Sequence, residues 1–180
     1  MQTAHAGMRS LVVVTLCAVG LVLSFEGCAV PVAKQMVPTG VSIVHHHSGS
    51  LRINVAGGGE EGSFLISAKS LQAAIEEAIL SSKVFREIIH GEKADYQLDV
   101  FLGDYQFPVG GFNMTTNIEA VWNLSDVSTK KTVWQKMIRA TSTASMGDAF
   151  AGVSRARMSA EGAARENVKQ GIEQLSQLSL

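Results

Sequence analysis

Two alternating segments in the second half of the chain constrain the fold most strongly. Apolar side chains fill one side of the segment 113–124, through Met114, Ile118, Ala120, Trp122 and Leu124. Successive side chains of a strand point to opposite faces, so this alternation predicts a strand with one buried face. After the polar residues 125–130, the segment 131–140 returns. We predict an antiparallel hairpin with its apex at 127–129, which places Trp122 opposite Trp134 and Ile118 opposite Ile138.

The remaining periodicities predict a fixed order of strands and helices. In chain order, they predict strands at 41–45 and 51–55, a helix at 68–81, strands at 84–89 and 94–105, the hairpin, and a helix at 147–178. Ser67 or Ser70 caps the first helix. This order predicts an α+β two-layer sandwich, in which a mostly antiparallel sheet carries two helices packed on one face.

The final helix has an apolar stripe that begins with Phe150 and Val153 and continues to Leu175. This stripe is expected to face the sheet. Gly162 and Gly171 lie inside the helix, where each glycine costs about 1 kcal/mol relative to alanine. They indicate either a close approach to the sheet or a kink.

The first thirty residues carry an export signal. Arg9 is followed by an apolar run over residues 11–25. The run is short for a membrane span, which needs about 20 residues, but it matches the apolar region of a signal peptide. We therefore predict a signal peptide over residues 1–27, with translation starting at Met1 or at Met8.

The residues Gly27, Cys28 and Ala29 follow this leader and resemble the lipobox of bacterial lipoproteins. The resemblance implies cleavage before Cys28 and acylation of its sulfur. Residues 28–40 are then the lipid attachment and a tether, and residues 41–180 form a single α+β domain. Ala29, rather than an aspartate after the cysteine, implies the outer membrane by the same resemblance.

Two alternatives to acylation remain open at the N-terminus. Phe25 and Glu26 stand where lipoproteins usually have leucine and a small residue. Ordinary cleavage after Ala29, with Gly27 and Ala29 as the small pair, would release a secreted periplasmic protein. Retention of the leader would instead leave an uncleaved anchor.

Charge and cysteine content exclude several classes of protein. The chain has 15 basic and 16 acidic residues and a net charge of −1, without a basic block. Nucleic acid is therefore not expected as a partner, because phosphate binding needs concentrated Lys and Arg. Cys17 lies inside the leader, so removal of the leader excludes a disulfide framework in the mature protein.

No motif of an enzyme or a metal centre is present. The chain lacks GxSxG and HExxH, and Cys28 is acylated or lost. His45 and His47 share a face of a predicted strand, but no acidic or cysteine partner stands at a ligand spacing, which favours a solvated strand end. Asp95 and Asp99 share a face too, and a polar outer face is favoured over a carboxylate pair. We predict no catalytic residue, no metal and no cofactor.

Two sets of residues are candidates for contact with a partner or lipid. Arg155, Arg157 and Arg165 lie on the final helix and, as an exposed stripe, would suit anionic headgroups or lipopolysaccharide phosphate. The default for this helix is a solvated face with a Glu161–Arg165 pair. Trp122 and Trp134 are core or rim residues, or else the aromatic part of a partner interface.

Three fragments of the mature region carry a wider resemblance. They are Leu71…Ala78-Ile79…Ser82…Phe85, then Ala94-Asp95-Tyr96-Gln97-Leu98, then Trp122-Asn-Leu-Ser-Asp126…Thr129…Val133-Trp134. These fragments resemble small bacterial envelope lipoproteins of the lipopolysaccharide-assembly and ABC-transport-auxiliary type, over most of residues 50–178. The resemblance implies a helix packed on a sheet and a non-catalytic accessory role. It transfers no site residues.

The expected function is therefore that of a membrane-anchored envelope lipoprotein. It would act as a non-catalytic accessory or assembly partner of a transport or envelope-biogenesis complex, with an envelope protein as its partner. The alternative is a periplasmic module that binds a lipid or glycolipid in a groove between sheet and helices. A periplasmic hydrolase is a third hypothesis, which needs a cleft with convergent His and carboxylate groups.

Overall fold

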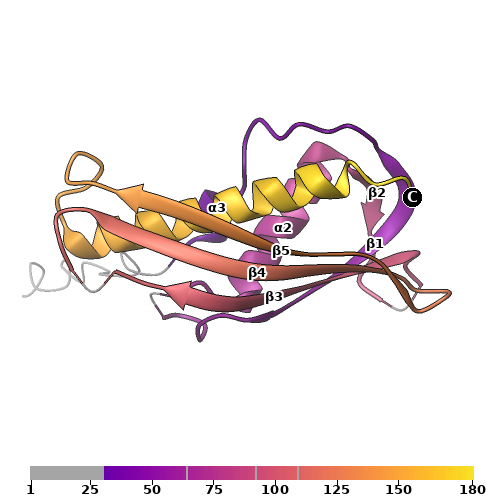
Figure 1. Cartoon of the computed structure of the whole chain (residues 1–180), viewed down its shortest axis with the longest axis horizontal. Coiled ribbons are helices and arrows are strands. Elements are labelled where there is room, and N and C mark those ends of the chain that lie inside the picture. The colour runs from indigo at the N-terminus through magenta and orange to yellow at the C-terminus, as the bar shows by residue number, and fades with distance from the viewer. Residues whose placement is uncertain (1–30, 64, 92, 109) are drawn as a thin grey trace, which may run out of the picture.

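The computed structural model describes residues 31–180, apart from residues 64, 92 and 109. The predicted signal peptide and Cys28 lie outside the described residues. The elements are α1 (Ala33–Met36), β1 (His47–Gly57), α2 (Ala68–Ser82), β2 (Phe85–Ile88), β3 (Tyr96–Gln106), β4 (Met114–Asp126), β5 (Lys131–Ala144) and α3 (Gly152–Leu175). They form an elongated body in which α3 runs along the long axis beside the sheet (Figure 1).

One five-stranded sheet has the order β2-β1-β3-β4-β5. β1 pairs in parallel with both β2 and β3, while the pairs β3–β4 and β4–β5 are antiparallel. The predicted α+β sandwich is confirmed, but its sheet is mixed rather than mostly antiparallel. The difference arises because α2 connects β1 to β2, and a helical crossover returns the chain in the same direction.

The predicted hairpin is present as β4 and β5, with a register two residues away from the prediction. Trp122 lies opposite Lys136, and Trp134 lies opposite Leu124. A register shift follows Leu124, and the turn uses one residue more than expected, ending at Lys130 in a left-handed conformation (φ 58°). The buried face was still predicted correctly, because only an odd shift moves side chains to the other face.

Two predicted elements have different bounds. Residues 41–45 are not a strand; they run along α3, where Ser42, Val44 and His45 donate backbone hydrogen bonds to Glu173 and Ser176. The final helix begins at Gly152 rather than at residue 147. Residues before it form a turn in which the Ser145 N–H donates to Asp148 Oδ2 at 2.7 Å. As a result, the first part of the predicted apolar stripe, Phe150 and Val153, is exposed instead of facing the sheet.

The core lies between the sheet and the two long helices, which cover the same face. Ser67 caps α2 as predicted, because its Oγ accepts the Ser70 N–H at 3.2 Å. α2 packs on β1 and β2, α3 packs on β4 and β5, and the two helices touch each other. One continuous apolar cluster joins them. A core of this kind supplies most of the driving force for folding.

Trp122 joins α3 to the middle of the sheet. A Cβ added at Gly171 would lie 2.6 Å from the Trp122 ring, so only glycine allows the helix to come this close. The Trp122 Nε1 donates to Asn167 Oδ1 at 3.0 Å, and Asn167 Nδ2 donates to the Ile138 carbonyl at 2.8 Å. Gly171 therefore marks a close approach to the sheet, and the buried polar groups there are satisfied.

Candidate functional site

The three arginines do not form an exposed stripe. Arg155 is buried. Its Nη1 donates to the carbonyls of Ala149 and Phe150 at 2.9 and 2.6 Å, and its Nη2 donates to the Gly111 carbonyl at 3.2 Å. A cation that serves three backbone acceptors ties two loops together, the one before β4 and the one before α3. Arg155 is therefore a structural residue, and the stripe required for headgroup binding is absent.

The two tryptophans do not form an exposed aromatic surface for a partner. Trp122 is fully buried, and Trp134 is half-buried at the edge of the core. Trp122 therefore has no surface to offer a partner. Contact through Trp134 stays a prediction.

The first described residues of the chain are fixed to α3. The Val32 N–H donates to Glu161 Oε1 at 2.9 Å, and Arg165 Nη1 donates to the Gln35 carbonyl at 2.8 Å. Met36, in α1, is fully buried in the core. The described part of the predicted tether thus packs as part of the fold. We call the contact of Val32 with Glu161 the anchor junction.

The segment that follows continues along the same helix. The Ser42 N–H donates to Glu173 Oε1 at 3.1 Å, and the His45 N–H donates to the Ser176 carbonyl at 2.9 Å. Residues 32–45 therefore run parallel to α3, from its middle to its C-terminal end. Val32, close to the start of the described residues, therefore lies beside Glu161 in the middle of the helix.

Glu161, the acceptor at the anchor junction, is the residue that the sequence pattern misplaced. The pattern puts it on a solvated face paired with Arg165, but it is buried, and its nearest cation is Arg157, with Nε 3.7 Å from Oε1. Burial raises the pKa of the Glu161 carboxyl, and the Val32 N–H and the charges of Arg157 and Arg165 oppose this rise. The available signal was the run of small residues around it, because a helix face rich in alanine packs closely.

The histidine cluster serves the fold. His47 is buried, with its Nε2 2.9 Å from the Leu175 carbonyl and its ring centroid 4.9 Å from that of Phe85. His46 Nδ1 lies 2.7 Å from the Lys83 carbonyl. The predicted solvated strand end is therefore wrong for His47. Among the described residues, no group of three or more His, Cys, Asp or Glu side chains is placed to hold a metal ion.

A polar cavity of about 450 Å³ lies at the end of the molecule where α3 finishes. Residues 47–49, 93–96, 126–128 and Leu180 line it, and we call this region the polar end. The Asp95 carboxylate accepts the Ser50 N–H at 2.7 Å and the Ser50 hydroxyl at 2.8 Å. These hydrogen bonds hold the pKa of Asp95 below its ordinary value.

This cavity is lined by one histidine, two serines and two aspartates, and two of these side chains, His47 and Asp95, are engaged in other hydrogen bonds. The His47 ring nitrogen is engaged by a backbone carbonyl, and Asp95 is turned toward Ser50. Asp99 does not join Asp95; it accepts from Asn54 and Gln97 on the outer face of the sheet, as the polar-face prediction expects. A nucleophile bonded to an oriented base is the feature that acyl-transfer chemistry needs.

Between the sheet and the two long helices, where the lipid-binding alternative expects a groove, the described residues form a continuous apolar cluster. Lipid binding there stays a prediction. Neither Arg155 nor Arg157 lines the polar cavity. No helix in the described part of the chain has the length and apolar character to cross a membrane.

Comparison with known proteins identifies relatives by fold. No protein-family model matches the chain, and no curated sequence matches it. Among solved structures, a Xanthomonas campestris protein of the family DUF330 has a TM-score of 0.51 at 15% identity, covering 82% of this chain and 89% of that one. The PelC dodecamer of Paraburkholderia phytofirmans has a TM-score of 0.52 at 14% identity, covering 77% and 94%.

A third structure, a candidate lipoprotein of Caulobacter crescentus, has a TM-score of 0.50 at 16% identity and covers 71% of this chain and 88% of that one. Identities this low carry no information about sites or partners. What the three matches establish is that this chain has the same fold as these bacterial proteins.

Proposed function

We propose that the protein is an exported envelope lipoprotein, anchored by acyl chains on Cys28, that acts as a non-catalytic accessory or assembly partner of a transport or envelope-biogenesis complex. Its place is the periplasmic side of the outer membrane. The observation that carries the proposal is the anchor junction. Val32 stands four residues after Cys28 and is already bonded to Glu161.

The anchor junction gives acylation a mechanical consequence. The chain between Cys28 and Val32 spans at most about 14 Å, at about 3.5 Å per extended residue. Several acyl chains, at about 0.8 kcal/mol per buried methylene, hold a protein on a bilayer essentially permanently, whereas one chain does not. The folded body is therefore held directly at the surface rather than on a long linker, which suits a fixed component of a membrane assembly.

The structural neighbours support this role. One of them is a candidate lipoprotein, and another, PelC, is a dodecamer. The same fold thus occurs in a protein that forms an assembly. We infer an assembly role for this chain on that support, together with the export signal.

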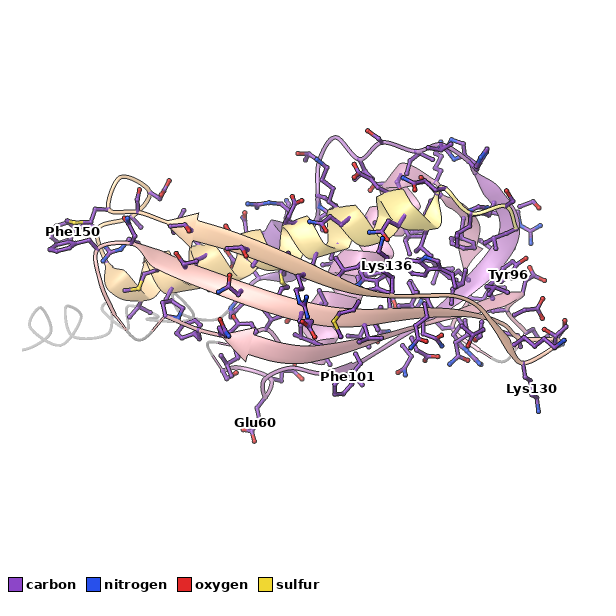
Figure 2. All side chains as sticks on the ribbon, viewed as in Figure 1. Glu60, Tyr96, Phe101, Lys130, Lys136 and Phe150 are labelled. Atoms are coloured by element: carbon purple, nitrogen blue, oxygen red, sulfur yellow. The ribbon has the colours of Figure 1, made fainter. Side chains whose placement is uncertain are left out.

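The outer face of the sheet offers a surface for protein contact. Phe101, Val121 and Met137 are register neighbours across β3, β4 and β5. Phe101 and Met137 are each about half exposed, and Figure 2 shows Phe101 projecting from the face away from α3. A row of apolar side chains surrounded by polar ones is the composition of a protein interface.

Mass spectrometry of the mature N-terminus tests the anchor. We expect Cys28 to be the first residue and to carry acyl mass, and we expect the Cys28→Ala variant to lack it. A mature chain starting at Val30, or one that keeps its leader without fatty acid, would contradict acylation.

Affinity capture from detergent-solubilised envelope tests the accessory role. The wild type should recover a stoichiometric membrane protein, and Met137→Glu should lose it, because the charge interrupts the apolar row. Gln135→Glu adds the same charge at an exposed position of the same strand face and serves as the control. Repeated recovery of the chain alone, or equal recovery by both variants, argues against the role.

A further inference from the structure

The end of the molecule where α3 begins exposes large apolar side chains. Phe112, in the loop before β4, is 78% exposed; Phe150, before α3, is 88% exposed; and Val153, in the first turn of α3, is 58% exposed. Met146 adds a fourth, half-exposed side chain. We call these four residues the apolar end. Figure 2 shows Phe150 at the extreme tip of the body, pointing away from it.

The backbone that carries these side chains is held by hydrogen bonds. Arg155 bonds the carbonyls of Ala149, Phe150 and Gly111, which belong to both loops of the apolar end. These part-buried, charge-assisted hydrogen bonds hold the two loops together at Gly111 and at Ala149 and Phe150. The exposed apolar surface is therefore a fixed part of the fold. Fully burying a side chain of this size contributes about 1.5–3 kcal/mol, so a cluster of them in water indicates a surface that is covered in use.

The length of chain before the described residues points to what covers it. Along α3, the distance from Glu161 back to Gly152 is about 14 Å, at 1.5 Å per residue. The chain from Cys28 to Val32 spans at most about the same distance. Toward the polar end, Leu175 lies about 21 Å from Glu161 by the same measure, which is beyond the span of this chain. Cys28 is therefore within reach of the apolar end and not of the polar end.

We propose that the apolar end is a bilayer-contacting surface, seated in the interfacial layer of the membrane that holds the acyl chains. This inference rests on the proposed acylation of Cys28. Its occupant is phospholipid, because the short tether brings this end, and not the polar end, to the bilayer surface. Apolar contact combined with acyl chains is the two-signal pattern of stable peripheral binding.

The arrangement also fixes the orientation of the domain. With its apolar end in the interface, the long axis of α3 stands away from the membrane and the polar end faces the aqueous compartment. The outer sheet face, with Phe101, then remains open to a protein partner. A domain attached only by a flexible lipidated linker would have no preferred orientation.

Quenching by brominated lipid tests the contact in the full, acylated chain. A Phe150→Trp variant is purified from membranes and reconstituted into phosphatidylethanolamine–phosphatidylglycerol vesicles with brominated acyl chains. The added emission should fall at least twofold relative to unbrominated vesicles. Phe101→Trp is the matched control, because Phe101 is an aromatic residue, 56% exposed, on the outer sheet face. Its added emission should not change, and Phe112→Trp, a second reporter, should behave like the Phe150→Trp variant.

The outcomes separate this inference from the anchor itself. Acyl mass on Cys28 is measured in the same sample. If the protein is acylated but the added emission of Phe150→Trp is quenched no more than that of Phe101→Trp, this inference alone is overturned. A blue-shifted but unquenched emission from Phe150→Trp shows that protein, such as a second copy of the chain, covers the apolar end, which also overturns it. A chain without acyl mass overturns both proposals.

Discussion

The two ends of the molecule use the same local chemistry and present opposite surfaces. At the apolar end, the Asp148 carboxylate accepts the Ser145 N–H at 2.7 Å and the Ser145 hydroxyl at 2.8 Å. At the polar end, Asp95 accepts the same two groups of Ser50 at the same distances. In both places, the hydrogen bonds lower the pKa of the aspartate.

The difference between the ends lies in Arg155. Among the residues that the structure describes, a buried guanidinium ties loops together at the apolar end alone, and the two phenylalanines of that end reach into water. The polar end surrounds an open cavity with Ser, Asp and Lys side chains. Exposed apolar residues on loops that are held together by hydrogen bonds indicate a binding surface. The comparison shows that an exposed apolar side chain indicates a binding surface only where hydrogen bonds hold the backbone that carries it.

Arg155→Ala should have the largest effect on this comparison. It leaves three backbone carbonyls of the apolar end without their charged donor, which costs about 3 kcal/mol of the free energy of unfolding. Arg165→Ala is the control, because Arg165 is exposed and donates to one carbonyl, that of Gln35, at 2.8 Å; it should cost less than about 1 kcal/mol. Urea denaturation measures both, and equal losses would show that the apolar end is not specially held.

Glu161→Ala should have the next largest effect, because it releases Val32. We expect a loss of about 1–2 kcal/mol and faster amide exchange at Val32. The control is Glu173→Ala, which removes a longer bond to the exposed Ser42 N–H and should change exchange at Ser42 only. Hydrogen exchange with mass spectrometry reads both sites. Unchanged exchange at Val32 would show that the anchor junction does not depend on Glu161.

Lys130→Gly should stabilise the hairpin turn at the polar end. Lys130 has φ 58°, a conformation that costs a residue with a Cβ about 1–2 kcal/mol and costs glycine nothing. After the entropy cost of glycine, a gain of up to about 1 kcal/mol remains. Lys131→Gly, one residue further and inside β5, should lower stability instead. A thermal melt in which both variants shift in the same direction would contradict this account of the turn.

The smallest effect should be the acid dependence of the two aspartates. Each has a folded pKa below its unfolded value, so its contribution to stability is complete above the unfolded pKa and is lost as pH falls through the folded pKa. Asp95→Asn and Asp148→Asn should each flatten the fall in stability below about pH 4. Similar flattening confirms that the two ends share this chemistry, and a change at one end only would separate them.

Periodicity predicted most of the elements and the buried face of the sheet. The residues 113–140 show their alternation plainly, so the hairpin was correct apart from its register. The register depended on one extra turn residue and an irregularity after Leu124, which no periodic pattern records. The parallel pairing of β1 could not be predicted either, because the alternation of side chains is the same in a parallel and in an antiparallel strand.

The candidate site was less predictable, because it is built by distant residues. The Cys28 motif can be read locally, but Val32 and Glu161 are 129 positions apart. Arg155 looks like a surface residue in a helical pattern, and its burial follows only from the carbonyls that two loops direct toward it. Phe150 falls within the apolar stripe of the pattern because the sequence does not show that α3 begins at Gly152.

The parallel course of residues 32–45 along α3 has a consequence for biogenesis. Under the proposed export, the chain emerges with its front first, and α3 arrives after the other described helices and strands. For a chain attached to the membrane at Cys28, the linker stays long until then: the stretch up to β1 can extend to roughly 60 Å. Arrival of α3 captures this stretch and draws the body down to the surface. Only a completely translocated molecule then lies at its final distance from the membrane. A partner that binds the domain at that distance would not bind unfinished chains.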